Sequence, residues 1–456
     1  MNYDVVFIGG GPGGYGAAIK ASSNGLRVAL IEKNKVGGTC LHVGCIPTKT
    51  LIASSAVVQT INSAKKFGID IDCYSIDYKR IKERKDEIVN KLHNSVITLL
   101  KTHGVDLFYG EGSFLSRNKI KVIGKENAII DVKNVIIATG STTSSINSLD
   151  VDGKKIHDST TILEMKSLPK KLTILGGGYI GCEFASLYSE LGVKITIVEA
   201  MPTIISTHSK NISRTLAESL KKKGVDVRCN VKMDGCKTND EFVELTLNDG
   251  STIKSDVLLI SVGRKPYTHG LNLNAVGLST DEHGFISVNE KMETTIDGIY
   301  AIGDVTGVSM LAHVASHQGS VAVDQIIGCN TIINYDAIPA VIFTHPEIAT
   351  VGLNLERATS RGYKAASAIV PFTALSKAIV DGYTDGYGEI IYEPTTGRIL
   401  GASIIGNDAG NLIAEMVLAI NCELTVESIF DTMHAHPTLS EGWGEAAAIL
   451  INSITR

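Results

Sequence analysis

The sequence predicts an α/β protein with two dinucleotide-binding, Rossmann-like βαβ domains and an α+β C-terminal domain. Three observations predict this fold class: a glycine-rich segment that occurs twice, short apolar runs that end in glycine, and a change of pattern near residue 338. The chain has 456 residues. At about 150 residues per domain, that length is enough for about three domains with cores of their own.

The repeated segment comes first along the chain. Residues 8–32 and 175–199 align without a gap, and each reads as a strand, a glycine-rich turn, a helix and a second strand that ends in an acid. This order is the βαβ dinucleotide fingerprint. The matched positions are Gly9, Gly11, Gly14 and Glu32 in the first copy and Gly176, Gly178, Gly181 and Glu199 in the second.

Each part of the fingerprint has a physical purpose. The first glycine makes the turn, the second lets the backbone approach a pyrophosphate, the third lets the helix pack on the strand, and the final acid accepts ribose hydroxyls. A single copy is also typical of an ordinary glycine-rich turn. Two complete copies in register favour a chain that binds two dinucleotides.

Further strands fit the two halves. Residues 134–141 and 255–264 are short apolar runs that contain Gly140 and Gly263 near their ends, as buried parallel strands do. The run 299–305 reaches Asp304, which by itself is typical of an ordinary turn or helix cap. Residues 77–103 have apolar side chains at helical spacing, and we interpret their charges as one solvated helix face.

From about residue 338 the pattern indicates an antiparallel sheet with helices. Four strand-like runs cover 339–352, 364–372, 386–393 and 398–406, and helical patterns cover 412–421 and 438–453.

Composition excludes several classes of function. The formal net charge is −5, so no global basic field favours nucleic acid. No window holds 18 or more uncharged apolar residues and no cleavable leader precedes the first strand, so we expect a cytoplasmic protein without a membrane span. Eight cysteines are too few for a disulfide scaffold, and a close cysteine pair therefore asks for a chemical explanation.

Such a pair lies in GGTCLHVGCIPTK, residues 37–49. Cys40 and Cys45 precede Pro47, which is placed as a proline at a helix start would be. A thiolate there would feel the helix dipole and lie near its partner, as expected of a redox-active pair. Two buried structural thiols are the alternative. A zinc site would need two more ligands close to the two cysteines, and His42 alone does not supply them, so we predict no metal site.

A candidate base lies near the C-terminus. His436 and Glu441 are close enough in sequence for the carboxylate to turn back and orient the imidazole. Dithiol oxidation needs a base, because only the thiolate attacks a disulfide. A structural histidine near a turn is the alternative for His436, and it is our interpretation of His434.

The two fingerprints, the cysteine motif, AIGD at 301–304 and HAHPTLSE at 434–441 together resemble the flavin-dependent pyridine-nucleotide disulfide oxidoreductases. The likeness covers essentially the whole chain. It implies tightly bound FAD at the first fingerprint and NAD(H) at the second. It also implies that 1–142 and 267–336 are the FAD-binding and central parts, 143–266 the NAD-binding domain and 337–456 the interface (dimerisation) domain.

The resemblance further implies residue roles. A dithiol, with dihydrolipoamide the expected one, is activated by His436 of a second subunit and attacks the disulfide at Cys40, and Cys45 passes electrons through FAD to NAD. A homodimer is therefore implied, and a lipoyl domain of a multienzyme complex is a candidate partner. The remaining family matches are Lys49 paired with Glu183, and the cofactor-binding positions Gly112, Gly140, Gly263, Asp304, Ala312 and His313.

Some positions depart from the family pattern and leave the substrate open. They are Val314, His317, Gln318, Leu375, Lys377 and the run Gly442, Trp443 and Gly444. Glutathione-reductase-like and mercuric-reductase-like enzymes remain alternatives, although Leu439 and Glu199 fit them less well. A flavoprotein subunit with a structural or regulatory role is a third alternative.

Overall fold

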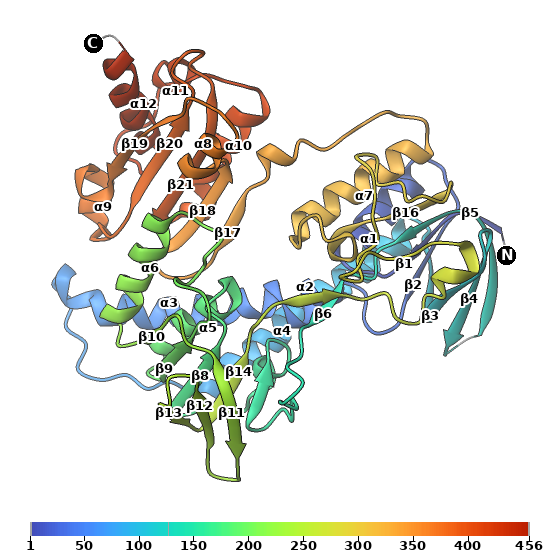
Figure 1. Cartoon of the computed structure of the whole chain (residues 1–456), viewed down its shortest axis with the longest axis horizontal. Helices are drawn as coiled ribbons and strands as arrows, with labels where there is room; N and C mark the ends of the chain where they lie inside the picture. The colour runs from blue at the N-terminus through green and yellow to red at the C-terminus, as the bar shows by residue number, and fades with distance from the viewer. Residues whose placement is uncertain (1, 126, 455–456) are drawn as a thin grey trace.

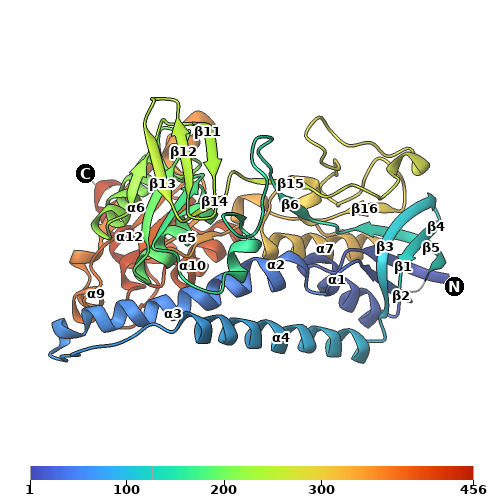
Figure 2. The ribbon, with the colours of Figure 1, turned by 90° about the horizontal axis from the view of Figure 1, so that it is seen from below.

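The structure, a computed structural model, describes residues 2–125 and 127–454. Figure 1 shows two sheet-containing units side by side and a C-terminal unit above one of them, and Figure 2 shows two long helices running beneath. Three sheets of five or six strands organise these units within the described residues.

The first sheet combines five strands from residues 2–137 with one strand, residues 299–301. Its parallel part runs β3, β2, β1, β5, β16, and β4 pairs antiparallel with β3 and β5. Helices α1 and α7 pack together beside it. The elements are β1 (Asn2–Ile8), α1 (Pro12–Ser23), β2 (Val28–Glu32), β3 (Asp106–Ser116), β4 (Lys119–Gly124), β5 (Ala128–Ile137), β16 (Ile299–Ala301) and α7 (Ala312–Ile326).

The second sheet is parallel throughout, in the order β10, β9, β8, β14, β7. It contains the second copy of the repeat as β8, α5 and β9, just as the first sheet contains β1, α1 and β2. Its elements are β7 (Ile156–Asp158), β8 (Lys171–Leu175), α5 (Tyr179–Glu190), β9 (Lys194–Val198), α6 (Lys210–Lys222), β10 (Asp226–Arg228) and β14 (Val257–Ile260), with the antiparallel β11 (Met233–Thr238), β12 (Val243–Leu247) and β13 (Thr252–Ser255).

A short antiparallel pair links these two units. Strands β6 (Ser141–Thr143) and β15 (Arg264–Pro266) bond to each other at the two points where the chain passes between the sheets. Short 3-10 turns complete the region: η2 (Thr161–Glu164), η3 (Leu273–Val276) and η4 (Gly303–Thr306).

The C-terminal unit is an antiparallel sheet in the order β17, β18, β21, β20, β19. Helix α10 packs on β18 and β21, and α12 packs on β19 and β20. Its elements are η5 (Tyr335–Ala337), β17 (Ala340–Ile342), β18 (Glu347–Gly352), α8 (Leu355–Ser360), β19 (Ala366–Pro371), η6 (Phe372–Ala374), α9 (Ser376–Asp381), β20 (Tyr387–Tyr392), β21 (Ile399–Gly406), α10 (Ala409–Asn421), α11 (Val426–Phe430) and α12 (Glu441–Ile454).

Three helices after the first repeat position the cysteine motif: α2 (Gly38–Val43), α3 (Cys45–Ser63), which η1 (Ala64–Phe67) extends, and α4 (Tyr78–Thr102). The stretch 38–67 reaches the length and apolar composition of a helix that could cross a membrane, and 39% of its most apolar window is buried. It packs on α4 and α5, which we interpret as the contacts of a core helix.

The prediction that the charges of residues 77–103 form one solvated face is wrong for helix α4. Its charges do not form a single solvated face, because the Lys85 side chain is only 2% exposed. The Lys85 ammonium lies 2.8 Å from Glu164 and 2.7 Å from Asp86, and it donates to the Leu163 carbonyl. A buried ammonium needs such partners to offset its lost hydration. The ion pair with Glu164 joins α4 to η2 of the second unit.

Candidate functional site

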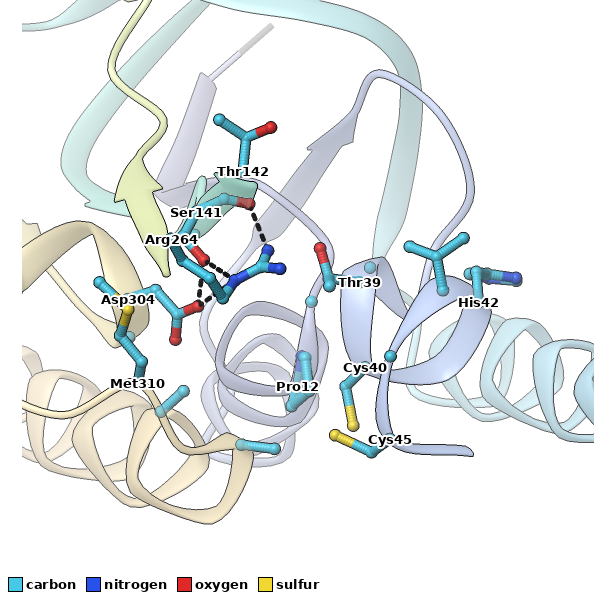
Figure 3. Close-up of a pocket in the computed structure, with 18 of the residues that line it drawn as sticks. Pro12, Thr39, Cys40, His42, Cys45, Ser141, Thr142, Arg264, Asp304 and Met310 are labelled. Carbon is cyan, nitrogen blue, oxygen red and sulfur yellow. Dashed lines mark hydrogen bonds and ion pairs between the residues drawn. The ribbon is translucent and has the colours of Figure 1, made fainter. Parts of the chain in front are cut away.

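A cavity of about 1420 Å³ opens among the first glycine turn, the cysteine helices and the two linking strands. Figure 3 shows part of its wall, with Pro12, the two cysteines, Arg264 and Asp304 facing the same space. Its lining includes these predicted site residues: Gly9, Gly11, Gly14, Glu32, Cys40, Cys45, Lys49, Gly112, Gly140, Glu183, Asp304, Ala312 and His313.

The first glycine turn has the shape that a dinucleotide needs. Gly9 has φ +111°, and a Cβ there would collide with the Ala138 carbonyl oxygen, whereas a Cβ at Gly11 would meet nothing within 4 Å. Open space therefore lies at the N-terminus of α1, where a pyrophosphate binds. Glu32 accepts hydrogen bonds from the Gly10 and Asn34 amides, each 2.8 Å long. These residues fit FAD.

A polar cluster that the sequence did not predict lies further along the cavity. Ser141 Oγ donates to the Asp304 carboxylate, and Arg264 donates from Nε to Ser141 Oγ at 2.7 Å and from Nη2 to its carbonyl at 2.9 Å. Arg264 directly follows the predicted site residue Gly263, but nothing in the sequence around Gly263 predicts that Arg264 contacts Ser141. The cluster holds Asp304 facing the cavity (Figure 3).

The cysteine pair occupies the junction of two helices. Cys40 lies within α2 and Cys45 begins α3, whereas the sequence indicated only the second helix. A Cβ at Gly44 would lie 2.9 Å from the Thr39 carbonyl oxygen, so a glycine permits this tight junction. The two sulfur atoms point toward each other as free thiols (Figure 3).

The two thiols differ in acidity. A hydrogen bond from Cys40, together with the nearby Lys49 charge, lowers the pKa of Cys45 to about 7 although burial opposes this. The same hydrogen bond and burial raise the pKa of Cys40. Cys45 also begins α3, where the helix dipole favours an anion. The negative charge of the reduced pair therefore belongs on Cys45.

Lys49 follows Cys45 by one helical turn and places a cation in the cavity. Its Nζ lies 2.9 and 2.8 Å from the two oxygens of Glu183, and 4.5 Å from the centre of the Phe343 ring. The Phe343 amide donates to the same Glu183 carboxylate at 2.9 Å. Glu183 thus joins α3, α5 and the start of the C-terminal unit. Sequence reasoning missed Phe343, which carries no motif.

The second glycine turn repeats the first but lies outside the cavity lining. Gly176 has φ +107° and packs against Ser261, a Cβ at Gly178 would meet nothing within 4 Å, and Gly181 packs against Gly176. Glu199 accepts from the Gly177 and Met201 amides at 2.6 and 2.7 Å. This geometry fits a second dinucleotide, NAD(H). Gly263, with φ +121°, also lies outside the lining.

The candidate base lies in the C-terminal unit. His436 Nδ1 is 2.8 Å from Glu441 Oε1, and the Thr438 amide donates to Glu441 Oε2 at 2.8 Å. These two contacts lower the pKa of Glu441. His436 and Glu441 do not line the cavity, and Figures 1 and 2 place α12 well away from α2. One chain therefore does not bring the base to the cysteines.

Comparison with known proteins defines the class. Residues 3–319 match the family described as pyridine nucleotide-disulphide oxidoreductase, and residues 338–447 match its dimerisation domain. The chain belongs to this family. It is an oxidoreductase, and FAD and NAD(H) are its cofactors, which confirms the predicted fold class and cofactors.

Particular relatives narrow the class. The chain is 44% identical to the dihydrolipoyl dehydrogenase of Chlamydia pneumoniae, over 99% of this chain and 98% of that protein, and 39% identical to that of Bacillus subtilis, over 98% and 97%. Among solved structures, LpdA from Mycobacterium tuberculosis superimposes with a TM-score of 0.93 at 27% identity, covering 98% of this chain and 99% of LpdA. The HOCl-induced flavoprotein disulfide reductase RclA from Escherichia coli gives 0.88 at 30%, covering 98% and 100%.

Proposed function

We propose that this chain oxidises dihydrolipoamide to lipoamide with NAD as the electron acceptor. The observation that carries the proposal is the cysteine pair at the junction of α2 and α3, which faces a cavity shared with the first glycine turn. FAD held at the first glycine turn and Glu32 would supply the two-electron chemistry that links the thiol pair to hydride transfer to NAD. The full-length likeness to dihydrolipoyl dehydrogenases supports this substrate.

The protein's own groups have distinct roles in this proposal. His436 removes a proton from the substrate dithiol, and the resulting thiolate attacks Cys40 of the oxidised pair, forming a mixed disulfide and releasing the Cys45 thiolate. The second substrate thiol then displaces Cys40, so the substrate leaves as a disulfide and the protein keeps two reduced sulfurs. Lys49 and the α3 dipole stabilise the Cys45 thiolate. Glu441 holds the imidazole in the tautomer that accepts the proton.

The proposal requires a homodimer, because His436 must come from a second subunit. The matched dimerisation domain supports this, and so do exposed apolar side chains near His436: Met433 is 96% exposed and Phe430 50%. We assign 1–142 and 267–336 to the FAD-binding unit, 143–266 to the NAD-binding unit and 337–456 to the interface. We propose a lipoyl domain of a multienzyme complex as the partner. We propose the cytoplasm as the location of the enzyme.

Steady-state turnover tests the substrate. We expect NADH oxidation with lipoamide to exceed that with glutathione disulfide by at least about a hundredfold in kcat/KM, a difference of about 2.7 kcal/mol. Preference for glutathione disulfide or for mercuric ion would replace the proposal with one of the related reductases. A flavin-loaded protein that turns over none of the three would indicate a structural or regulatory subunit.

A further inference from the structure

Within one chain, burial does little to fix the His436 side chain. The His436 side chain is 70% exposed, and Glu441 is the first residue of α12. The position of both groups therefore depends on what holds the first turn of α12 and the chain segment before it. A base displaced by even 1 Å transfers protons poorly, so this support matters to the reaction.

The first turn of α12 is anchored by the only tryptophan in the chain. Trp443 follows Glu441 by two residues and is 2% exposed. Its indole Nε1 donates to the Leu412 carbonyl of α10 at 3.1 Å. A Cβ at Gly388 of β20 would lie 3.4 Å from the Trp443 ring, so the ring lies directly on that strand.

The other end of the segment is anchored to the same helix. His434 precedes His436 by two residues, its side chain is 10% exposed, and its Nε2 lies 2.9 Å from Glu415 Oε1 on α10. A Cβ at Gly444 would lie 3.2 Å from His434 Nδ1. The glycine therefore lets the imidazole lie against α12.

A third contact closes the cluster. A Cβ at Gly442 would lie 3.2 Å from Leu375 Cδ1, and Leu375 is 4% exposed. Leu375 and the run 442–444 are positions where the sequence departs from the family pattern. The structure shows that these departures meet at one place, beside Glu441. By contrast, Lys377 forms an ion pair with Asp381 on α9.

We propose that His434 and Trp443 are positioning residues for the general base. Helix α10 holds the two ends of segment 434–443 through Glu415 and the Leu412 carbonyl, and His436 and Glu441 lie between those ends. His434 is then a structural histidine, as the sequence indicated, whose contact with Glu415 also positions the base. This inference rests on the proposed role of His436 as the base.

The test compares two reactions of the FAD-loaded dimer. Oxidation of dihydrolipoamide by NAD needs the base, whereas oxidation of NADH by ferricyanide needs neither thiol nor base. We expect His434→Ala to lower kcat of the first reaction about tenfold, with KM within about twofold and the second reaction unchanged. His434→Gln, whose amide can donate to Glu415, should restore most of the loss.

Trp443→Phe is the milder second variant, because it keeps an aromatic ring in the core while it removes the indole N–H together with the five-membered ring that carries it. We expect it to lower kcat severalfold in the first reaction alone. Glu445→Gln is the matched control, an exposed position in the same helical turn, and should leave both reactions unchanged. A parallel fall of both reactions in His434→Ala would overturn the inference in favour of a purely structural role.

Activity of three variants separates a failure of this inference from a failure of the proposed function. If His436→Gln abolishes dihydrolipoamide oxidation while His434→Ala and Trp443→Phe keep the wild-type kcat, this inference is wrong and the proposed function stands. If His436→Gln itself retains full dithiol turnover, the proposed base is wrong and the inference falls with it.

Discussion

At the scale of single residues, the chemistry of the cavity depends on which of two neighbouring thiols carries the negative charge. Cys45 is favoured by the hydrogen bond from Cys40, by Lys49 and by its place at the start of α3. The hydrogen bond lowers the pKa of Cys45 more than Lys49 does, and it comes from a side chain that can be replaced.

Replacing Cys40 should therefore change the acidity of Cys45. In the reduced Cys40→Ala protein, the lost hydrogen bond destabilises the Cys45 thiolate, so its pKa rises from about 7 toward the ordinary thiol value. Less thiolate is then present at neutral pH, and alkylation of Cys45 by iodoacetamide should slow about tenfold there. Peptide mass spectrometry across a pH series measures this rate. Cys40→Ser, which keeps a hydroxyl donor, should retain a midpoint near that of the parent, and an unshifted midpoint in Cys40→Ala would contradict the argument.

Nucleotide choice also rests on one side chain. Glu199 is held by two backbone amides at the end of β9, where its charge repels a 2′-phosphate and its oxygens can accept ribose hydroxyls. We expect the protein to prefer NAD over NADP by at least about tenfold in kcat/KM, or about 1.4 kcal/mol. Glu199→Ala should lose most of this preference while FAD content stays the same. Equal use of both nucleotides by the parent protein would refute the prediction.

At the scale of elements, contacts between helices bring separate sheets to one site. Glu183 of α5 bonds to Lys49 of α3 and to the Phe343 amide, and Lys85 of α4 bonds to Glu164 of η2. Each contact joins segments more than 70 residues apart in sequence. The Lys85 side chain is 2% exposed, whereas the Lys49 side chain is 31% exposed. Lys85 and Glu164 also line the cavity.

Breaking the Lys85 contact should destabilise the junction. Lys85→Ala removes a buried side chain and its contact across the junction, while Lys82 still pairs with Asp86 and Glu164, so we expect a loss of about 2 kcal/mol from the truncated packing. Thermal unfolding followed by release of FAD fluorescence should show a melting temperature lower by several degrees. Lys79→Ala is the control, because that side chain is 82% exposed and its pairing with Glu83 contributes little. Equal shifts in the two variants would show that burial of Lys85 is unimportant.

At the scale of the whole molecule, the distance between base and cysteines within one chain determines what assembly the enzyme needs. The cavity contains Cys40 and Cys45, and the C-terminal unit presents His436 on its surface. A two-fold dimer can bring each base to the cysteines of the other subunit, which gives two sites built from both chains.

Mixed dimers test this arrangement. Cys45→Ser and His436→Gln homodimers should both be nearly inactive in dithiol oxidation. A mixed dimer with shared sites places both lesions in one site and leaves the other intact, and random exchange makes about half of all dimers mixed. We therefore expect about one quarter of wild-type activity per total dimer. Native mass spectrometry of tagged subunits verifies the exchange, and activity near zero after verified exchange would exclude the shared site.

The sequence alone was sufficient for the features that depend on residues close together in the chain. Both βαβ repeats were predictable because Gly9, Gly11 and Glu32, and their counterparts, have the fixed spacing of a glycine turn followed by an acid. In the structure, Glu32 and Glu199 accept hydrogen bonds from backbone amides of these turns. The cysteine pair and the His436–Glu441 contact were predictable for the same reason, since each spans only five residues.

Tertiary structure decided everything that requires several elements to pack together. It brought Arg264 to Ser141 and Asp304, buried Lys85 against Glu164, and laid His434 and Trp443 against α10. No local pattern marks these contacts, because each joins side chains from separate elements whose approach depends on the packing of whole sheets and helices. The same packing holds His436 away from the cysteines of its own chain, since the C-terminal sheet builds a separate core around Trp443 and presents the base on its outer surface.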